Sequence, residues 1–218
     1  MIDWNKIQTV LLDMDGTLLD LNFDNHFWLS HIPLRYSEKH NISFDHAHDK
    51  LMPIFKSVEG TIDWYCVDYW SERLELDIAQ LKAEVAHLIA IHPYVLEFLD
   101  ALQKNNIRSV LVTNAHQKSL ALKLKHTQLD AHLDHIVCSH DYGVPKEDQS
   151  FWQQFHAEEN FSNHSTLLID DSLSVLRSAQ KYGIEHLLAV YDPDSQQPTR
   201  EIEGFEAIYS FKDIMPKP

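Results

Sequence analysis

Thr9-Val-Leu-Leu runs directly into Asp13-Met-Asp-Gly-Thr-Leu-Leu-Asp20, and this stretch decides the fold of the chain. The residues before Asp13 predict a short buried strand of a parallel sheet. Asp13 and Asp15 then lie together at the carboxyl end of that strand, where open α/β sheets bind ligands. Gly16 lets the backbone turn sharply and approach a ligand closely. Taken alone, the motif is also compatible with a solvated acidic turn.

Two carboxylates held as close together as Asp13 and Asp15 repel each other and are difficult to remove from water. Their pairing would be explained by a bound divalent cation, or by a reaction that uses the two groups in different roles. A single acidic pair is weak evidence for either explanation. Further polar groups elsewhere in the chain, able to act together with Asp13 and Asp15, would strengthen it.

Three later segments carry polar groups at the ends of apolar runs or in loops. Arg108-Ser-Val-Leu-Val-Thr-Asn114 is β-rich and ends in a hydroxyl and an amide. Val144-Pro-Lys146 is a turn with one lysine, and Thr166-Leu-Leu-Ile-Asp-Asp-Ser172 is an apolar run that ends in two carboxylates. Alone, the Thr113 hydroxyl would be read as a cap of the next helix and Lys146 as a solvated loop lysine.

The order of these motifs resembles the haloacid dehalogenase superfamily over nearly the whole chain. The resemblance implies that Asp13 is a nucleophile that forms an aspartyl-phosphate, and that Asp15 is a general acid and base. It further implies that Thr113, Asn114 and Lys146 bind the phosphoryl oxygens. Asp15 favours phosphoryl transfer over dehalogenation, because a departing halide needs no proton.

The resemblance also implies a Mg²⁺ site, and magnesium suits an all-oxygen ligand set. Asp13 and Asp170 would supply side-chain oxygens, and Asp15 its main-chain carbonyl. Asp171 would orient a metal-bound water or Lys146, although the adjacent pair leaves open which of the two carboxylates binds directly.

Beyond the motifs, the pattern predicts a doubly wound α/β core with a parallel sheet, formed by residues 1–20 and 91–218. Apolar residues at helical spacing, with no convincing strand, predict an all-helical cap at 21–90. The expected strands are 9–12, 108–113, 135–138, 166–169 and 186–190. The expected helical segments are 24–39, 44–56, 63–73, 79–89, 94–105, 117–127, 150–159 and 172–182, with a last helical turn at 211–215.

Composition narrows the classes of partner. The chain has 218 residues, with 18 Lys and Arg against 33 Asp and Glu, for a net charge of −15. Such a field disfavours nucleic-acid polymers and anionic membranes, while a small phosphorylated substrate remains compatible with a locally positive cleft. The two cysteines and the lack of a long apolar segment lead us to expect a soluble cytoplasmic protein.

Fifteen histidines raise the question of a histidine metal site. The pairs His46-Ala-His48 and His132-x-x-His135 lack the helical spacing and the accompanying glutamate of the zinc-protease motif. We expect surface or partly buried structural histidines, and small buried thiols at Cys66 and Cys138.

The predicted cap contains Asp63-Trp-Tyr-Cys-Val-Asp-Tyr-Trp-Ser-Glu-Arg73, with four large aromatic residues within seven positions. These rings either fill the core of the cap or stack on a base of the substrate, with Arg73 near it. The second alternative makes Trp64, Tyr65, Tyr69 and Arg73 candidate substrate contacts.

Together with Asn22-x-Asp-Asn-His26 and Tyr142-Gly-Val-Pro-Lys-Glu-Asp-Gln149, this cap resembles the purine 5′-nucleotidase branch that acts on GMP and IMP. The resemblance weakens after Asp192. A sugar-phosphate or phosphoglycolate phosphatase, a phosphomutase on the same core, and a catalytically silent interaction module remain alternatives. The sequence leaves the oligomeric state open.

Overall fold

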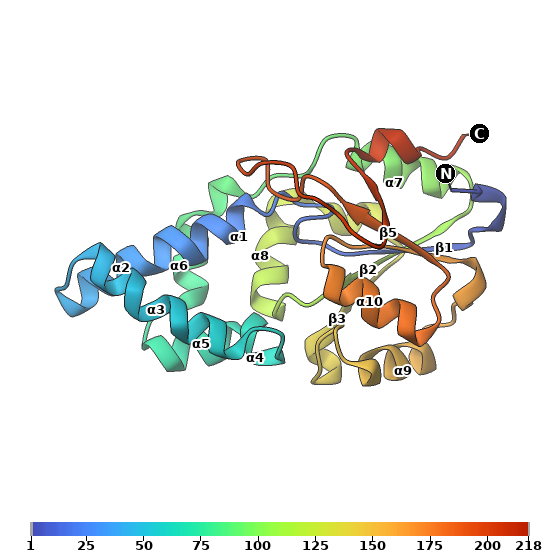
Figure 1. Ribbon diagram of the computed structural model, residues 1–218. Coiled ribbons are helices and arrows are strands. Elements are labelled where there is room, and N and C mark those ends of the chain that lie inside the picture. Colours follow the sequence, from blue (N-terminus) through green and yellow to red (C-terminus); the bar gives the residue numbers. More distant parts are fainter. Residues whose placement is uncertain (1, 218) are drawn as a thin grey trace.

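The computed structural model describes residues 2–217. Within them, parallel strands form one sheet in the order β3-β2-β1-β4-β5-β6 (Figure 1). The strands are β1 (Thr9–Leu12), β2 (Arg108–Thr113), β3 (His135–Cys138), β4 (Thr166–Ile169), β5 (His186–Val190) and β6 (Glu206–Ile208). The order reverses at β1, which pairs with β2 on one side and β4 on the other. The crevice at such a reversal is where open α/β sheets bind ligands.

Helices cover both faces of the sheet. Alternate residues of each strand point to opposite faces, and in β1 the residues on both faces are buried. Val10 and Leu12 pack in one cluster with α7 (Val95–Lys104), and Leu11 packs in another with α9 (Gln149–Glu158) and α10 (Leu173–Tyr182). The doubly wound α/β core is therefore confirmed.

The chain between β1 and α7 is helical and forms a hydrophobic cluster of its own, which includes Phe23, Phe55 and Trp70. We call residues 22–88 the cap helices, and Figure 1 shows them to one side of the sheet. Helix α8 (Gln117–Thr127) belongs to the core and contacts α6. The cap helices are α1 (Asn22–His26), a π-helical turn (Phe27–His31), α2 (Ile32–His40), α3 (Phe44–Val58), α4 (Ile62–Tyr65), α5 (Val67–Leu74), α6 (Ile78–Glu84) and a 3-10 turn (Ala86–Leu88).

Three local features differ from the sequence prediction. The expected helix 63–73 is broken at Cys66, which is extended and whose Sγ accepts a hydrogen bond from the backbone N–H of Tyr69. The helical stretch from residue 22 to 40 contains a π-helical turn just before Pro33, which lacks the N–H needed for a regular helical bond. Strand β6 was not predicted.

Among residues 2–217, no helix combines the length and the apolar character that a membrane crossing requires.

Candidate active site

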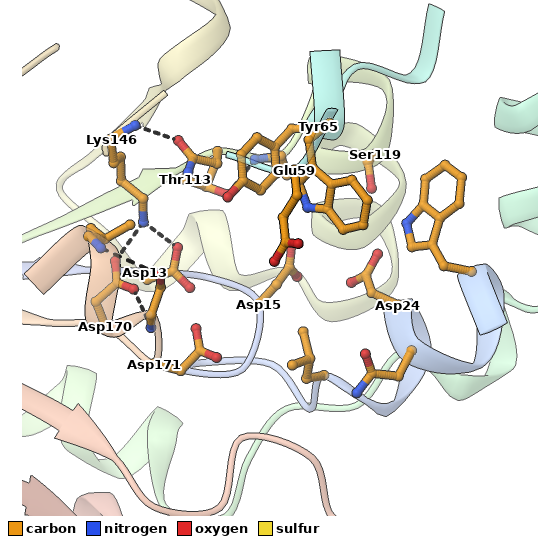
Figure 2. A pocket seen from close by; sticks show the side chains of 18 of the residues that line it. Asp13, Asp15, Asp24, Glu59, Tyr65, Thr113, Ser119, Lys146, Asp170 and Asp171 are labelled. Atoms are coloured by element: carbon orange, nitrogen blue, oxygen red, sulfur yellow. Dashed lines mark hydrogen bonds and ion pairs between the residues drawn. The ribbon is translucent and has the colours of Figure 1, made fainter. Parts of the chain in front are cut away.

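Asp13 leaves the end of β1 at the middle of the sheet, and its backbone N–H donates to the Ile169 carbonyl at 3.0 Å. Its carboxylate faces Lys146, whose Nζ lies 2.5 Å from Asp13 Oδ1 and 2.7 Å from Asp170 Oδ2 (Figure 2). The same ammonium donates to the Val112 carbonyl at 2.8 Å. Lys146 is only 1% exposed, so it is a buried cation held by two carboxylates rather than a solvated loop lysine.

Three carboxylates converge at this point. Oxygens of Asp13, Asp170 and Asp171 lie within 4.8 Å of one another. Burial raises the pKa of Asp13 to about 6, and the negative charge of Asp170 adds to the effect while Lys146 opposes it. Burial also raises the pKa of Asp170, and raises that of Asp171 well above the usual range. Two of these carboxylates are buried and Asp171 is half-buried, and the only cations beside them are Lys146 and, 3.6 Å from Asp171 Oδ2, the Nη1 of Arg200 among the described residues. Two cations leave three carboxylates with excess negative charge, and this all-oxygen set fits a hard divalent cation.

The backbone holds Asp171 close to the first motif. The backbone N–H of Asp171 donates to Thr17 Oγ1 at 3.1 Å, and Arg200 Nη2 donates to the Asp171 carbonyl at 2.8 Å. Gly16 has φ +85°, and a Cβ at this position would lie 2.7 Å from Asp171 Cγ. Glycine is therefore required by a close approach to a carboxylate, as well as by the positive φ.

Thr113 is the last residue of β2, Asn114 follows it, and both line the same cavity as Lys146. The Thr113 Oγ1 accepts from the backbone N–H of Ala115 at 3.0 Å, which leaves the hydroxyl hydrogen for another acceptor. The Asn114 Oδ1 accepts from the backbone N–H of Lys146 at 2.9 Å, and its Nδ2 donates to Glu147 Oε2 at 3.0 Å. The Asn114 side chain therefore orients the lysine loop.

Glu147 extends this network to the cap. Its second oxygen, Oε1, accepts from the Tyr65 hydroxyl at 2.8 Å. A cap residue is thus connected through Glu147 to the amide of Asn114, next to the proposed nucleophile.

Asp15 points away from the carboxylate cluster, toward the cap helices (Figure 2). Its Oδ1 lies 2.6 Å from the Nζ of Lys123, a buried residue of α8. Burial raises the pKa of Asp15 to about 6, with Lys123 lowering it and Asp24 and Asp13 raising it. A carboxyl with such a pKa can both donate and accept a proton near neutral pH.

Lys123 also pairs with Asp24 of α1, at 2.6 Å from Oδ2, while Lys82 of α6 lies 2.7 Å from Asp24 Oδ1. Burial works against the ionised form of Asp24, but Lys123 and Lys82 outweigh it and hold the pKa of Asp24 well below its usual range. Four charged side chains in alternating sign therefore run from the first motif into the cap.

A cavity of about 760 Å³ lies between the carboxyl ends of the strands and the cap helices. It is lined by the predicted site residues of the α/β core and by Trp64 and Tyr65 of the cap helices. Tyr69 and Arg73 are not among its lining residues. Tyr69 packs edge-on against Trp70, at 5.0 Å between ring centroids, and Arg73 is exposed on α5. Nine of the site residues predicted from the sequence line this cavity together: Asp13, Asp15, Trp64, Tyr65, Thr113, Asn114, Lys146, Asp170 and Asp171.

Several cavity residues had no role in the sequence analysis. Trp28 adds an aromatic ring from the π-helical turn, and Asp24, Lys82 and Arg200 add charge. Asp24 lies in the stretch Asn22–His26, which contributes to the resemblance to the purine nucleotidases. Its pairing with Lys82 and Lys123 could not be predicted from that stretch.

Comparison with known proteins assigns the family. The profile of haloacid dehalogenase-like hydrolases matches residues 10–189. The chain is 39% identical over 215 residues to the GMP/IMP nucleotidase YrfG of Escherichia coli strain K12, which covers 99% of this chain and 97% of the relative. The predicted resemblance to the purine nucleotidase branch is thereby confirmed.

Solved structures share the fold at lower identity. A haloacid dehalogenase-type phosphatase from Thermococcus onnurineus superimposes with a TM-score of 0.80 at 20% identity, covering 95% of this chain and 96% of that one. The L-2-haloacid dehalogenase of Xanthobacter autotrophicus gives a TM-score of 0.62 at 12% identity, with 95% and 96% covered. The chain belongs to the haloacid dehalogenase-like hydrolase family.

Proposed function

We propose that the protein is a magnesium-dependent phosphomonoesterase that hydrolyses purine nucleoside 5′-monophosphates to nucleoside and phosphate. The observation that carries the proposal is the joint placement of Asp13 and Asp15 in one cavity, with the lysine and carboxylates of the later motifs around Asp13. A dehalogenase has no use for the second acid, whereas a departing ribose oxygen needs a proton.

The reaction follows from the two carboxyl groups. An oxygen of Asp13 attacks phosphorus, the bond from phosphorus to O5′ breaks, and Asp15 donates its proton to O5′. The ionised Asp15 then takes a proton from a water molecule, which attacks the phosphorus of the aspartyl-phosphate. The bond from phosphorus to the Asp13 oxygen breaks, phosphate leaves, and Asp13 and Asp15 return to their initial states.

Lys146 and Thr113 act on the transferred group. The Lys146 ammonium fixes the Asp13 carboxylate and supplies positive charge where the phosphoryl oxygens gather. The Thr113 hydroxyl, which lines the cavity, donates to one of those oxygens. Asn114 holds the backbone of Lys146 in place, and its side-chain amide also binds a phosphoryl oxygen.

Asp13 and Asp170 would hold Mg²⁺ with side-chain oxygens, and Asp15 with its main-chain carbonyl, while Asp171 lies beside them as an orienting group. When bound, the ion neutralises charge on the carboxylate cluster and on the phosphoryl group.

The substrate class rests on the cap side of the cavity and on the full-length relative. Trp28, Trp64 and Tyr65 line the cavity together, which offers flat apolar faces to a purine. The cavity volume of about 760 Å³ is within the range of small-molecule sites. The relative with 39% identity is named for GMP and IMP.

A substrate panel with Mg²⁺ tests the proposal: GMP, IMP, AMP, CMP, phosphoglycolate and hexose phosphates, with phosphate release and product identity both measured. We expect GMP and IMP to give the highest kcat/KM. Phosphate from sugar phosphates or phosphoglycolate alone would overturn the purine assignment. An isomeric sugar phosphate as product would identify a mutase, and no magnesium-dependent turnover on any phosphoester would favour the non-catalytic alternative.

A further inference from the structure

A second group of metal-ligating side chains lies outside the carboxylate cluster, where the cap helices meet the core. Cys66 lies between α4 and α5, His116 precedes α8, and His140 lies in the 3-10 helix Ser139–Tyr142. One ligand atom of each lies within 4.8 Å of those of the other two. Residues from three separate segments thus converge, one from the cap and two from the core.

The state of these side chains also points to a ligand. His140 Nε2 is buried and has no hydrogen-bond partner among the described residues. The rings of His116 and His140 are nearly perpendicular, with centroids 4.9 Å apart. Cys66 is a free thiol, since neither cysteine forms a disulfide, and its Sγ is held in direction by the N–H of Tyr69 at 3.4 Å. A buried unpaired ring nitrogen is costly unless something binds it.

We propose that Cys66, His116 and His140 form a binding site for a divalent cation of the zinc class that joins the cap helices to the core. One sulfur and two imidazole nitrogens are the donors that zinc prefers, and they differ from the all-oxygen set around Asp13. A water molecule completes the tetrahedral set, and the Cys66 thiol releases its proton to solvent on binding. The cation-binding atoms move together by a small amount, because zinc bonds are about 2.0–2.3 Å long.

The position of the site gives it a consequence for turnover. An ion pair already joins the two sides of this boundary, since Lys118 Nζ lies 2.5 Å from a carboxylate oxygen of Asp68 on α5. The other Asp68 oxygen lies 3.7 Å from His116 Nε2, and burial lowers the pKa of His116, which favours the neutral ring that a metal ion requires. His116 lines the large cavity, and Cys66 directly follows Tyr65, another lining residue. A cation bound by all three ligands adds a bond across this boundary, so it opposes opening of the cap. Substrate entry and product release through a cap require that opening.

Cobalt(II) is the probe for the binding site, used on the full chain with excess Mg²⁺ to occupy the carboxylate cluster. We expect a thiolate-to-cobalt charge-transfer band in the near ultraviolet that Zn²⁺ abolishes by competition. Cys66→Ser should lose the band, while Cys138→Ala, which alters the other thiol, should keep it. Absence of the band in the unaltered protein, or its persistence in Cys66→Ser, would overturn the proposal.

His140→Gln provides a second variant that leaves the thiol intact. Its dissociation constant for Zn²⁺, measured by equilibrium dialysis with Mg²⁺ present, should rise at least tenfold, and an unchanged constant would count against the site. Circular dichroism of each variant checks that it is folded.

The effect on activity rests on the proposed phosphatase function, whereas the binding measurements do not. With saturating Mg²⁺, micromolar Zn²⁺ should lower kcat on GMP at least fivefold in the unaltered protein and in Cys138→Ala, but not in Cys66→Ser. Equal inhibition of all three would overturn the link to the cap. A clear cobalt band in a protein that hydrolyses no phosphoester would leave the metal site standing and refute the proposed function instead.

Discussion

The Nζ of Lys123 lies 2.6 Å from Asp15 Oδ1 and, on its other side, 2.6 Å from an oxygen of Asp24. A lysine of the core helix α8 therefore connects the proposed general acid to the cap. Lys123 is buried and both carboxylates are half-buried, and Lys82 gives Asp24 a second cation. The position of the cap helices and the charge state of Asp15 are therefore coupled through Lys123 and Asp24.

Replacing Lys123 by Met should destabilise the fold, because it leaves Asp15 without its cation and Asp24 with one cation instead of two. Breaking a buried ion pair from one side typically costs about 3–5 kcal/mol. The measurement is urea unfolding followed by circular dichroism. Lys118→Met is the matched control on the same helix, since Lys118 is largely exposed and should change stability little. Equal stability of both variants would contradict the role given to the network.

Asp15→Asn should separate leaving groups. The variant keeps Asp13 and the main-chain carbonyl of residue 15, but it cannot protonate O5′. We expect kcat on GMP to fall by about 10²–10⁴-fold. The loss on p-nitrophenyl phosphate should be much smaller, because its phenolate leaves without a proton. Equal losses on both substrates would show that Asp15 has another role.

The pH dependence of stability follows from Asp13 in the metal-free protein. Burial raises its pKa to about 6, against about 3.9 in an unfolded chain. Between these values the folded protein binds more protons than the unfolded chain, so this carboxyl makes the free energy of unfolding fall as pH rises.

Asp13→Asn removes that contribution. With a chelator present, the free energy of unfolding of the variant minus that of the unaltered protein should increase by about 2–3 kcal/mol from pH 4 to pH 7. Denaturant titrations at several pH values measure the difference. A difference that stays flat across this range would show that the Asp13 carboxyl titrates normally in the folded protein.

Trp64→Leu should weaken recognition of the purine, because Trp64 lines the cavity. Stacking of a base on an aromatic ring contributes about 1–3 kcal/mol, so KM for GMP should rise by roughly tenfold or more. KM for p-nitrophenyl phosphate should change little. Tyr69→Leu is the control from the neighbouring helix, and an equal rise of KM for GMP in both variants would argue against direct stacking by Trp64.

Much of the core could be predicted from the sequence, and particular residues show why. The strands β1 to β5 have the predicted bounds, because each is an apolar or β-branched run followed directly by polar residues. Asp13 and Asp170 each directly follow one of these strands and Thr113 is the last residue of another, so the parallel sheet itself brings them to one edge. Strand β6 is three residues long and begins with Glu206, which gives too short a pattern to detect.

The parts that were not predicted depend on how the cap meets the core. Helix α8 carries Lys118, Lys123 and Lys125, and no local pattern tells which one is buried. Lys123 is the buried one, and its partners Asp15 and Asp24 come from the first motif and from α1, which are distant in the sequence. The convergence of Cys66 with His116 and His140 has the same origin, since the three positions are distant in the sequence. The division into residues 1–20 and 91–218 as core and 21–90 as cap stays a prediction, and so does the cytoplasmic location.

Chemical trapping of the acyl phosphate tests the central claim, that Asp13 receives the phosphoryl group. The protein is mixed with GMP and Mg²⁺, quenched in acid during turnover and reduced with borohydride, which converts an aspartyl-phosphate into homoserine. Peptide mass spectrometry should then find homoserine at position 13, dependent on both GMP and Mg²⁺ and absent from Asp13→Asn. Efficient hydrolysis of GMP by Asp13→Asn, or homoserine at another aspartate in its place, would contradict the account.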